Sequence, residues 1–123
     1  MAISPFDSKI LYAAVETDRR HGAVYKTTNS GGSWSKMSDT VSGATGPHYY
    51  QELVASPHVF DKIYLMDTKV QVSENGGKDF YIMNESDKHV DNHSLTFKMS
   101  DPNYLLIGTD GGVYESFDDT NSW

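Results

Sequence analysis

Three eight-residue segments that each end on an aromatic residue divide this chain into repeats of nearly constant length. The segments, called octets below, are residues 27–34, 73–80 and 116–123. Their closing aromatics stand at positions 34, 80 and 123, so successive repeats are 46 and 43 residues long. A period of this length is typical of arrays in which each repeat buries its apolar surface against its neighbours. The repeat therefore restricts the chain to a modular architecture.

Each octet has a small hydroxyl residue first, Asn or Asp third and an aromatic last, with glycine fifth in the first two. These residues are Thr27, Asn29, Gly31 and Trp34, then Ser73, Asn75, Gly77 and Phe80, and finally Ser116, Asp118 and Trp123, with Thr120 where glycine is expected. The Asn or Asp side chain can accept hydrogen bonds from backbone amides ahead of it, and glycine supplies a positive φ. The pattern predicts a tight turn that needs no chemistry, altered in the third octet.

Short runs of β-branched and aromatic residues fill the space between the octets. Such runs between turn residues predict strands. Each repeat has room for three strands before its octet and a fourth that starts at the aromatic. Four antiparallel strands in about 40–45 residues are the size of a propeller blade. We therefore predict an all-β fold, a single partial β-propeller of about three blades over residues 1–46, 47–88 and 89–123, with the outer strand of the last blade missing.

Composition excludes several classes of function. The chain of 123 residues has 17 Asp and Glu against 10 Lys and Arg, a net charge of −7, which disfavours nucleic acid as a partner. It has no cysteine, so disulfides and thiolate metal ligands are excluded. Its longest apolar run, residues 10–15, is much shorter than the roughly 18 residues of a membrane span. It lacks a signal-peptide pattern, a phosphate-binding glycine loop and a nucleophile motif, and we expect no cofactor.

The octets resemble the Asp-box, or BNR repeat, found in propellers of sialidases, xyloglucan-degrading glycosidases and sortilin-like receptors. The chain is most similar to the sortilin-like, BNR "glycosyl hydrolase" branch. The segments that carry this resemblance are residues 3–5 with 10–13, His48-Tyr49-Tyr50, residues 89–95 and residues 108–114. The resemblance implies a propeller with Asp-boxes at its periphery, ligands on its central face, and catalysis in only some members. It also implies a secreted or periplasmic parent protein.

His89, Asp91 and His93 form the first candidate site. Alternate residues of a strand point to the same face, and two imidazoles with a carboxylate suit a divalent metal. Equally, Asp91 could orient a histidine for sugar or anion binding. The simplest interpretation is that Asp91 and His93 tie the loop between blades to neighbouring backbone, and we assign no metal site. In relatives this segment commonly reads His-x-Asp-His-His-x-Leu, so Asn92 replaces the central histidine here.

Asp110 is the second candidate. It lies in Gly108-Thr109-Asp110-Gly111-Gly112, which resembles, one residue out of step, the stretch around a catalytic carboxylate in xyloglucan-degrading relatives. Glycoside hydrolysis needs two carboxyl groups, about 5–5.5 Å or 6.5–9.5 Å apart, and in those relatives the partner comes from a region that this chain lacks. The alternative, which we favour, is a hairpin turn of the kind that Asp-Gly forms.

His48, Tyr49 and Tyr50 follow a glycine-rich stretch at the start of the second blade. Exposed tyrosines can stack on sugar rings or peptide side chains, whereas buried ones fill the wedge between blades. We favour packing and keep ligand binding as the alternative.

Residues 16–21 are the most polar stretch and predict a solvated hairpin loop. Arg19 and Arg20 are the only arginines, too few for the triad that binds sialic acid, so sialidase activity is not expected.

Two functions stay open on the sequence alone. The first is a non-catalytic module that binds a glycan or a protein. The second is a fragment of a secreted glycoside hydrolase whose second catalytic carboxylate lies outside this chain. In neither case is the isolated chain expected to be catalytically competent. Three blades leave sheet faces and a strand edge uncovered, which proteins rarely tolerate. We therefore expect either further blades in a longer chain or association between copies.

Overall fold

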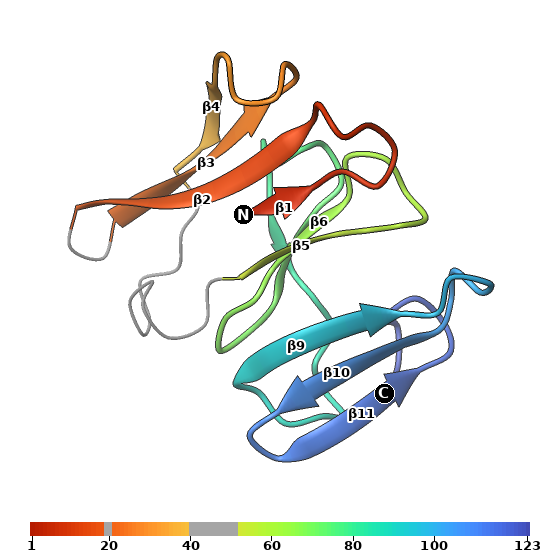
Figure 1. Cartoon of the computed structure of the whole chain (residues 1–123). Helices are drawn as coiled ribbons and strands as arrows, with labels where there is room; N and C mark the ends of the chain where they lie inside the picture. Colours follow the sequence, from red (N-terminus) through yellow and green to blue (C-terminus); the bar gives the residue numbers. More distant parts are fainter. Residues whose placement is uncertain (19–20, 40–51) are drawn as a thin grey trace.

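A computed structural model describes residues 1–18, 21–39 and 52–123 of the chain. In these ranges the regular structure is three antiparallel sheets (Figure 1). The strands are β1 (Ala2–Ile3), β2 (Leu11–Asp18), β3 (His21–Thr27), β4 (Ser35–Ser38), β5 (Leu53–Ala55), β6 (Ile63–Leu65), β7 (Gln71–Ser73), β8 (Tyr81–Ile82), β9 (Asn92–Phe97), β10 (Leu105–Thr109) and β11 (Gly112–Ser116). The all-β prediction is confirmed. The same ranges contain no helix that is long and apolar enough to cross a membrane.

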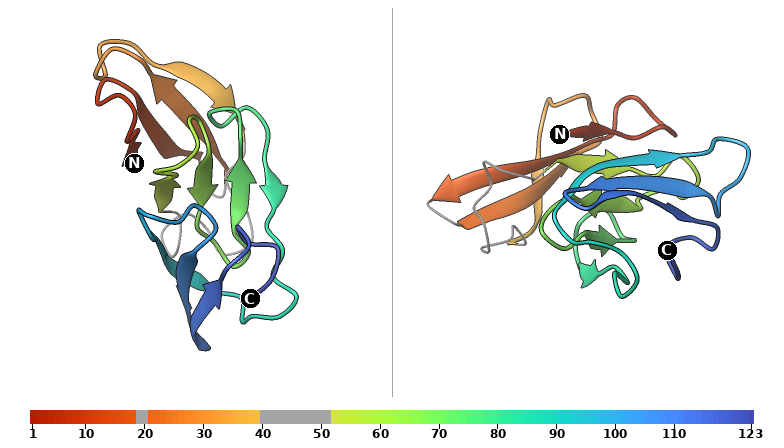
Figure 2. Two further views of the ribbon diagram at one scale, coloured as in Figure 1. Left: turned by 90° about the vertical axis from the view of Figure 1, so that its right-hand side faces the viewer. Right: turned by 90° about the horizontal axis from the view of Figure 1, so that it is seen from below.

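The order of strands in each sheet follows the sequence. The first sheet is β1-β2-β3-β4 and the second is β5-β6-β7-β8, so each has the four strands expected of a blade. The third sheet is β9-β10-β11, and the described residues after β11 add no fourth strand. Figures 1 and 2 show the second sheet between the other two. This succession of small antiparallel sheets is that of a partial propeller.

The first two octets form the same hydrogen-bonded turn. In the first, Gly31 N–H donates to Thr27 Oγ1 over 3.1 Å, and Ser33 N–H donates to Asn29 Oδ1 over 2.8 Å. In the second, the corresponding distances are 2.8 Å from Gly77 N to Ser73 Oγ and 3.0 Å from Asp79 N to Asn75 Oδ1. The octet turn is thus stabilised by its own side chains. The hydroxyl oxygen and the side-chain amide oxygen accept hydrogen bonds from backbone N–H groups that the turn would leave unpaired.

The third octet makes the same turn although it lacks the glycine. Thr120 N–H donates to Ser116 Oγ over 3.0 Å, and Ser122 N–H donates to Asp118 Oδ1 over 2.9 Å. Thr120 has a φ of 73°, close to the 88° of Gly31. The altered turn that we expected is therefore not observed. A β-branched residue rarely adopts a positive φ, so the replacement of glycine by Thr120 strains the backbone at that residue without changing the turn.

Each octet is also anchored to the residue two positions before the second strand of its sheet. In all three repeats the amide of the fourth octet residue donates to that carbonyl. These bonds are Ser30 N to Lys9 O at 2.9 Å, Gly76 N to Asp61 O at 2.9 Å and Asp119 N to Asn103 O at 3.0 Å. The anchors define equivalent positions in the three sheets.

The apolar core lies between successive sheets. One cluster joins the first and second sheets through Ile10, Tyr12, Val24, Leu53, Ile63 and Leu65. A second cluster joins the second and third sheets through Tyr64, Met66, Val70, Val72, Met83, Leu95 and Ile107. Because side chains alternate along a strand, β6 sends Ile63 and Leu65 to one cluster and Tyr64 to the other. All three are buried, so the second sheet is covered on both faces.

The sheets have two structurally distinct ends. The octets lie at one end, called the octet end. The β2–β3 and β10–β11 hairpins lie at the other, and in Figure 1 both point to the left. The chain also passes from the second sheet to the third at this second end, called the connection end. His89, Asp91, His93 and Asp110 all lie there, away from the octets.

Candidate functional site

His93 and Asp110 meet at the connection end of the third sheet. His93 Nε2 lies 2.6 Å from Asp110 Oδ1, and the two side chains are 47% and 56% exposed. Their meeting depends on an irregular register, because Ser94 pairs with Gly108 whereas Asn92 pairs with Thr109. His93 is the extra residue of this β-bulge, a feature that re-aims a side chain.

Asp110 occupies the turn that joins β10 to β11. Thr109 pairs with Gly112, which leaves Asp110 and Gly111 as a two-residue hairpin loop. Gly112 has a φ of 125°, a value that suits only glycine. The favoured interpretation of Asp110 as a turn residue and the alternative of a functional carboxylate are therefore compatible. The backbone forms the turn while the carboxylate contacts His93.

His89 and Asp91 do not share a strand face with His93. β9 begins only at Asn92, and Asp91 has a φ of 62°, so the expected alternation does not apply. Asp91 acts through its backbone: its amide donates to Thr68 O over 2.9 Å, and its carbonyl accepts from Asp110 N over 3.2 Å. His89 lies against the hairpin loop, since a Cβ built on Gly111 would stand 2.6 Å from the Cβ of His89.

A buried polar cluster supports this end of the molecule. Lys88 Nζ lies 3.2 Å from Glu85 Oε1, and their side chains are 0% and 5% exposed. Lys88 also donates to Asn92 Oδ1 over 2.5 Å, and Asn92 Nδ2 donates to the carbonyls of Asp67 and Thr68. Burial lowers the pKa of Lys88, and the charge of Glu85 opposes that shift. The cluster joins the β6–β7 turn of the second sheet to the start of β9.

Sequence reasoning missed Lys88 and Glu85, because charged residues between blades suggest a solvated loop. The signal available was Asn92, the residue that departs from the family pattern. In the structure it is 0% exposed and fixes the loop beside His93. The tie to neighbouring backbone that we expected from Asp91 and His93 is made by the Asp91 backbone and the Asn92 side chain.

The arrangement at this end suits hydrogen bonding better than metal binding. Within residues 1–18, 21–39 and 52–123, no group of three or more His, Cys, Asp or Glu side chains is placed to hold a metal ion. His48, Tyr49 and Tyr50, along with Arg19 and Arg20, lie outside the described residues. Among the described residues at this end, the exposed His93–Asp110 pair is therefore the candidate site.

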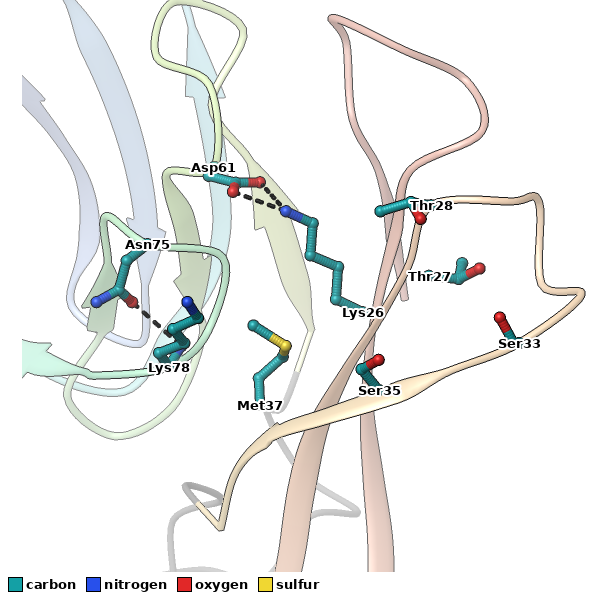
Figure 3. A pocket seen from close by; sticks show the side chains of 9 residues that line it. All are labelled: Lys26, Thr27, Thr28, Ser33, Ser35, Met37, Asp61, Asn75 and Lys78. Atoms are coloured by element: carbon teal, nitrogen blue, oxygen red, sulfur yellow. Dashed lines mark hydrogen bonds and ion pairs between the residues drawn. The ribbon is translucent and has the colours of Figure 1, made fainter.

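A separate pocket of about 250 Å³ lies at the octet end, between the first and second sheets (Figure 3). Its lining is Lys26, Thr27, Thr28, Ser33, Ser35, Met37, Asp61, Asn75 and Lys78. Lys26 Nζ reaches across the interface to both carboxylate oxygens of Asp61, each at 2.7 Å. Tyr12 donates to the same carboxylate over 2.5 Å. Burial, with this hydrogen bond, raises the pKa of Tyr12. Because Lys26 and Asp61 neutralise each other, we assign this network to the joining of the sheets.

No protein-family model matches the chain, and a search of curated proteins finds no match either. Solved structures do match it. A GH74 enzyme from Niastella koreensis superposes with a TM-score of 0.76 at 17% identity, over 98% of this chain and 21% of that one. An ancestral GH74 enzyme gives 0.74 at 20% identity, over 99% and 17%. The GH74 xyloglucanase from Xanthomonas campestris gives 0.70 at 19% identity, over 99% and 22%.

These likenesses concern the fold. The chain spans about a fifth of the length of the solved structures that it matches. Identities below a quarter do not carry an activity from one protein to another, because one fold hosts many functions. What the superpositions show is the arrangement of the three sheets. The chain has the fold of a partial β-propeller, similar to part of the GH74 enzymes.

Proposed function

We propose that this chain supplies three blades of a secreted or periplasmic propeller that binds carbohydrate at its connection end. The observation that carries the proposal is the half-exposed His93–Asp110 pair, held in place by a β-bulge and a two-residue turn. A carboxylate has acceptor capacity beyond its bond to one histidine, and sugar hydroxyls are suitable donors. The buried Lys88–Glu85–Asn92 cluster beneath keeps the loop in one conformation, which lowers the entropy cost of binding.

The test is calorimetric titration of the chain with xyloglucan and cellulose oligosaccharides. We expect His93→Ala and Asp110→Ala each to weaken binding about tenfold, the effect of losing one charge-assisted hydrogen bond. Lys69→Ala is the matched control, because Lys69 is an exposed residue of the β6–β7 turn. Failure of the unmodified chain to bind any of these sugars, or equal binding by all variants, would contradict the proposal.

A second candidate function rests on the exposure of Asp110. Its carboxylate contacts His93 and is 56% exposed, so it is open to a substrate as well as to a ligand. In this alternative Asp110 is one of the two carboxyl groups of a glycoside hydrolase, and the other lies outside residues 1–123. The test is to express the full reading frame that contains this segment and to measure xyloglucan hydrolysis. Loss of hydrolysis in Asp110→Asn with oligosaccharide binding retained supports catalysis, whereas loss of binding alone supports the first proposal.

A further inference from the structure

The outward face of the third sheet exposes a valine at the position where each of the other two sheets buries one. Val24, Val70 and Val113 each stand three residues before an octet. Val24 and Val70 are 0% exposed because the next sheet covers them, whereas Val113 is 72% exposed. Phe117, four residues further along, is 69% exposed. A groove of about 780 Å³ runs over this face, lined by these two residues together with Leu106 and Glu115.

The outward face of the first sheet shows the complementary half of an interface. Phe80 and Trp123, the closing aromatics of the second and third octets, pack against the clusters shared with the preceding sheet. Trp34, the corresponding residue of the first octet, is 40% exposed, and Ile3 on β1 is 58% exposed. The described residues thus present one half of a blade interface at each side of the array.

Charges at equivalent positions determine what can cover these faces. In the first interface Lys26 forms an ion pair with Asp61. Lys26 is the residue directly before the first octet. Asp61 is the residue whose carbonyl anchors the second octet. The residue equivalent to Lys26 in the third sheet is Glu115. The residue equivalent to Asp61 in the first sheet is Lys9. Both are exposed, and Glu115 accepts a hydrogen bond from Tyr104 within its own sheet.

We propose that a second copy of this chain docks head to tail, with its first sheet on the third sheet, so that its Lys9 lies opposite Glu115. The pair has the opposite polarity to Lys26–Asp61 and is equally attractive. Because the two faces differ, the contact is heterologous, and two copies form either a closed ring or an open chain. A closed pair would contain six blades, within the usual range of propellers.

Analytical ultracentrifugation of the unmodified chain between about 1 and 200 µM tests the proposal. We expect a mass above that of one chain, with association that increases with concentration. A single-chain mass throughout this range would overturn the proposal. In that case the two outer faces would have to be covered by blades that do not belong to a second copy of this chain.

Charge substitutions then identify the faces. Glu115→Lys and Lys9→Glu should each weaken association about tenfold, because attraction becomes repulsion at both contacts of a ring. A mixture of the two variants should associate like the unmodified chain, since each contact in a mixed pair joins opposite charges. An interface between two identical faces would respond to only one of the substitutions, and the mixture would not recover.

Lys69→Glu is the matched control, because it reverses one charge in the turn of the middle sheet, away from both outer faces. It should associate like the unmodified chain. If it weakens association as much as Lys9→Glu, the effect is one of net charge and the pairing of Lys9 with Glu115 is wrong. Circular dichroism of each variant verifies that the sheets are intact. Sugar binding at His93 and Asp110 is measured separately and does not depend on this result.

Discussion

Each of the two interfaces between sheets contains an apolar cluster, but the polar contacts beside the two clusters differ. The first adds the Lys26–Asp61 pair at the octet end, where the side chains are 15% and 21% exposed. The second adds Lys62–Asp119 at the octet end and the Lys88–Glu85–Asn92 cluster at the connection end. Because apolar packing alone has little directional preference, we infer that the polar contacts fix how each pair of sheets is oriented.

The Lys26–Asp61 pair is more exposed than the Lys88–Glu85 pair, which predicts that the two pairs differ in their effect on the free energy of unfolding. A partly exposed pair is screened by solvent, so its loss is tolerated. A buried pair gains little as a whole, but loss of one partner leaves a buried charge without compensation. Glu85 Oε2 already has no hydrogen-bond partner among the residues that the structure describes. The second interface is therefore the more sensitive of the two, and it is the one beside the candidate site.

The largest expected effect comes from exchanging a lysine for methionine in each interface. Lys88→Met should lower the free energy of unfolding by about 3–5 kcal/mol, because the Glu85 carboxylate stays buried without its counter-charge. Lys26→Met should lower it by about 1 kcal/mol. Urea unfolding measures both. The double variant Lys88→Met with Glu85→Leu should recover part of the loss, and failure to do so would mean that packing and not charge is the cause.

Two octet glycines give the next largest contrast. A Cβ on Gly77 would lie 2.7 Å from Val24 Cγ1 in the first sheet, whereas a Cβ on Gly31 meets only Trp34, at 3.7 Å. Both glycines have positive φ. Gly77→Ala should therefore lower the free energy of unfolding by about 3 kcal/mol and Gly31→Ala by about 1 kcal/mol. Equal losses would show that the second octet does not pack against the first sheet.

A tyrosine at the same position of each interface predicts instability in alkali. Burial raises the pKa of Tyr12 and of Tyr64, helped by Asp61 in one case and Asp119 in the other. Above pH 10 the unfolded chain loses these protons while the folded chain keeps them, so stability falls as pH rises. Each tyrosine contributes about 1.4 kcal/mol per pH unit in that range.

Unfolding measured from pH 9 to 11 in Tyr12→Phe and in Tyr64→Phe tests this dependence. Each substitution should reduce the slope by the contribution of one tyrosine. An unchanged slope in either variant would mean that the hydroxyl at that interface is accessible to solvent, and it would remove the symmetry between the two positions.

The smallest effect concerns the third octet. Thr120→Gly should raise the free energy of unfolding by about 0.5–1 kcal/mol, because glycine removes the strain of a positive φ, although it adds entropy to the unfolded chain. The reverse change, Gly31→Thr, should destabilise the first octet. Thermal unfolding of both variants provides the measurement. A loss of stability in Thr120→Gly would show that the threonine side chain stabilises the turn by more than its strain.

The octets made most of the fold predictable, because their turn chemistry is local and their spacing sets the size of a sheet. His93 and Asp110 were both candidates on the sequence, but their contact was not predicted. It depends on a β-bulge opposite Thr109, and a one-residue change of register is invisible in a pattern of residue types. Lys88 and Glu85 were missed for another reason. Nothing in a charged loop distinguishes a solvated segment from one that is later covered by a neighbouring sheet.

The double coverage of the middle sheet has a consequence for how the molecule comes apart. Ile63, Tyr64 and Leu65 are buried by neighbours on two sides, whereas among the described residues each outer sheet has one face packed against another sheet. Either outer sheet can open locally at the expense of one interface, but opening the middle sheet disrupts both. Its backbone amides are therefore the ones that exchange with deuterium only when the whole array unfolds. We therefore expect the middle sheet to set the cooperativity of the chain, although it contributes some of its shortest strands.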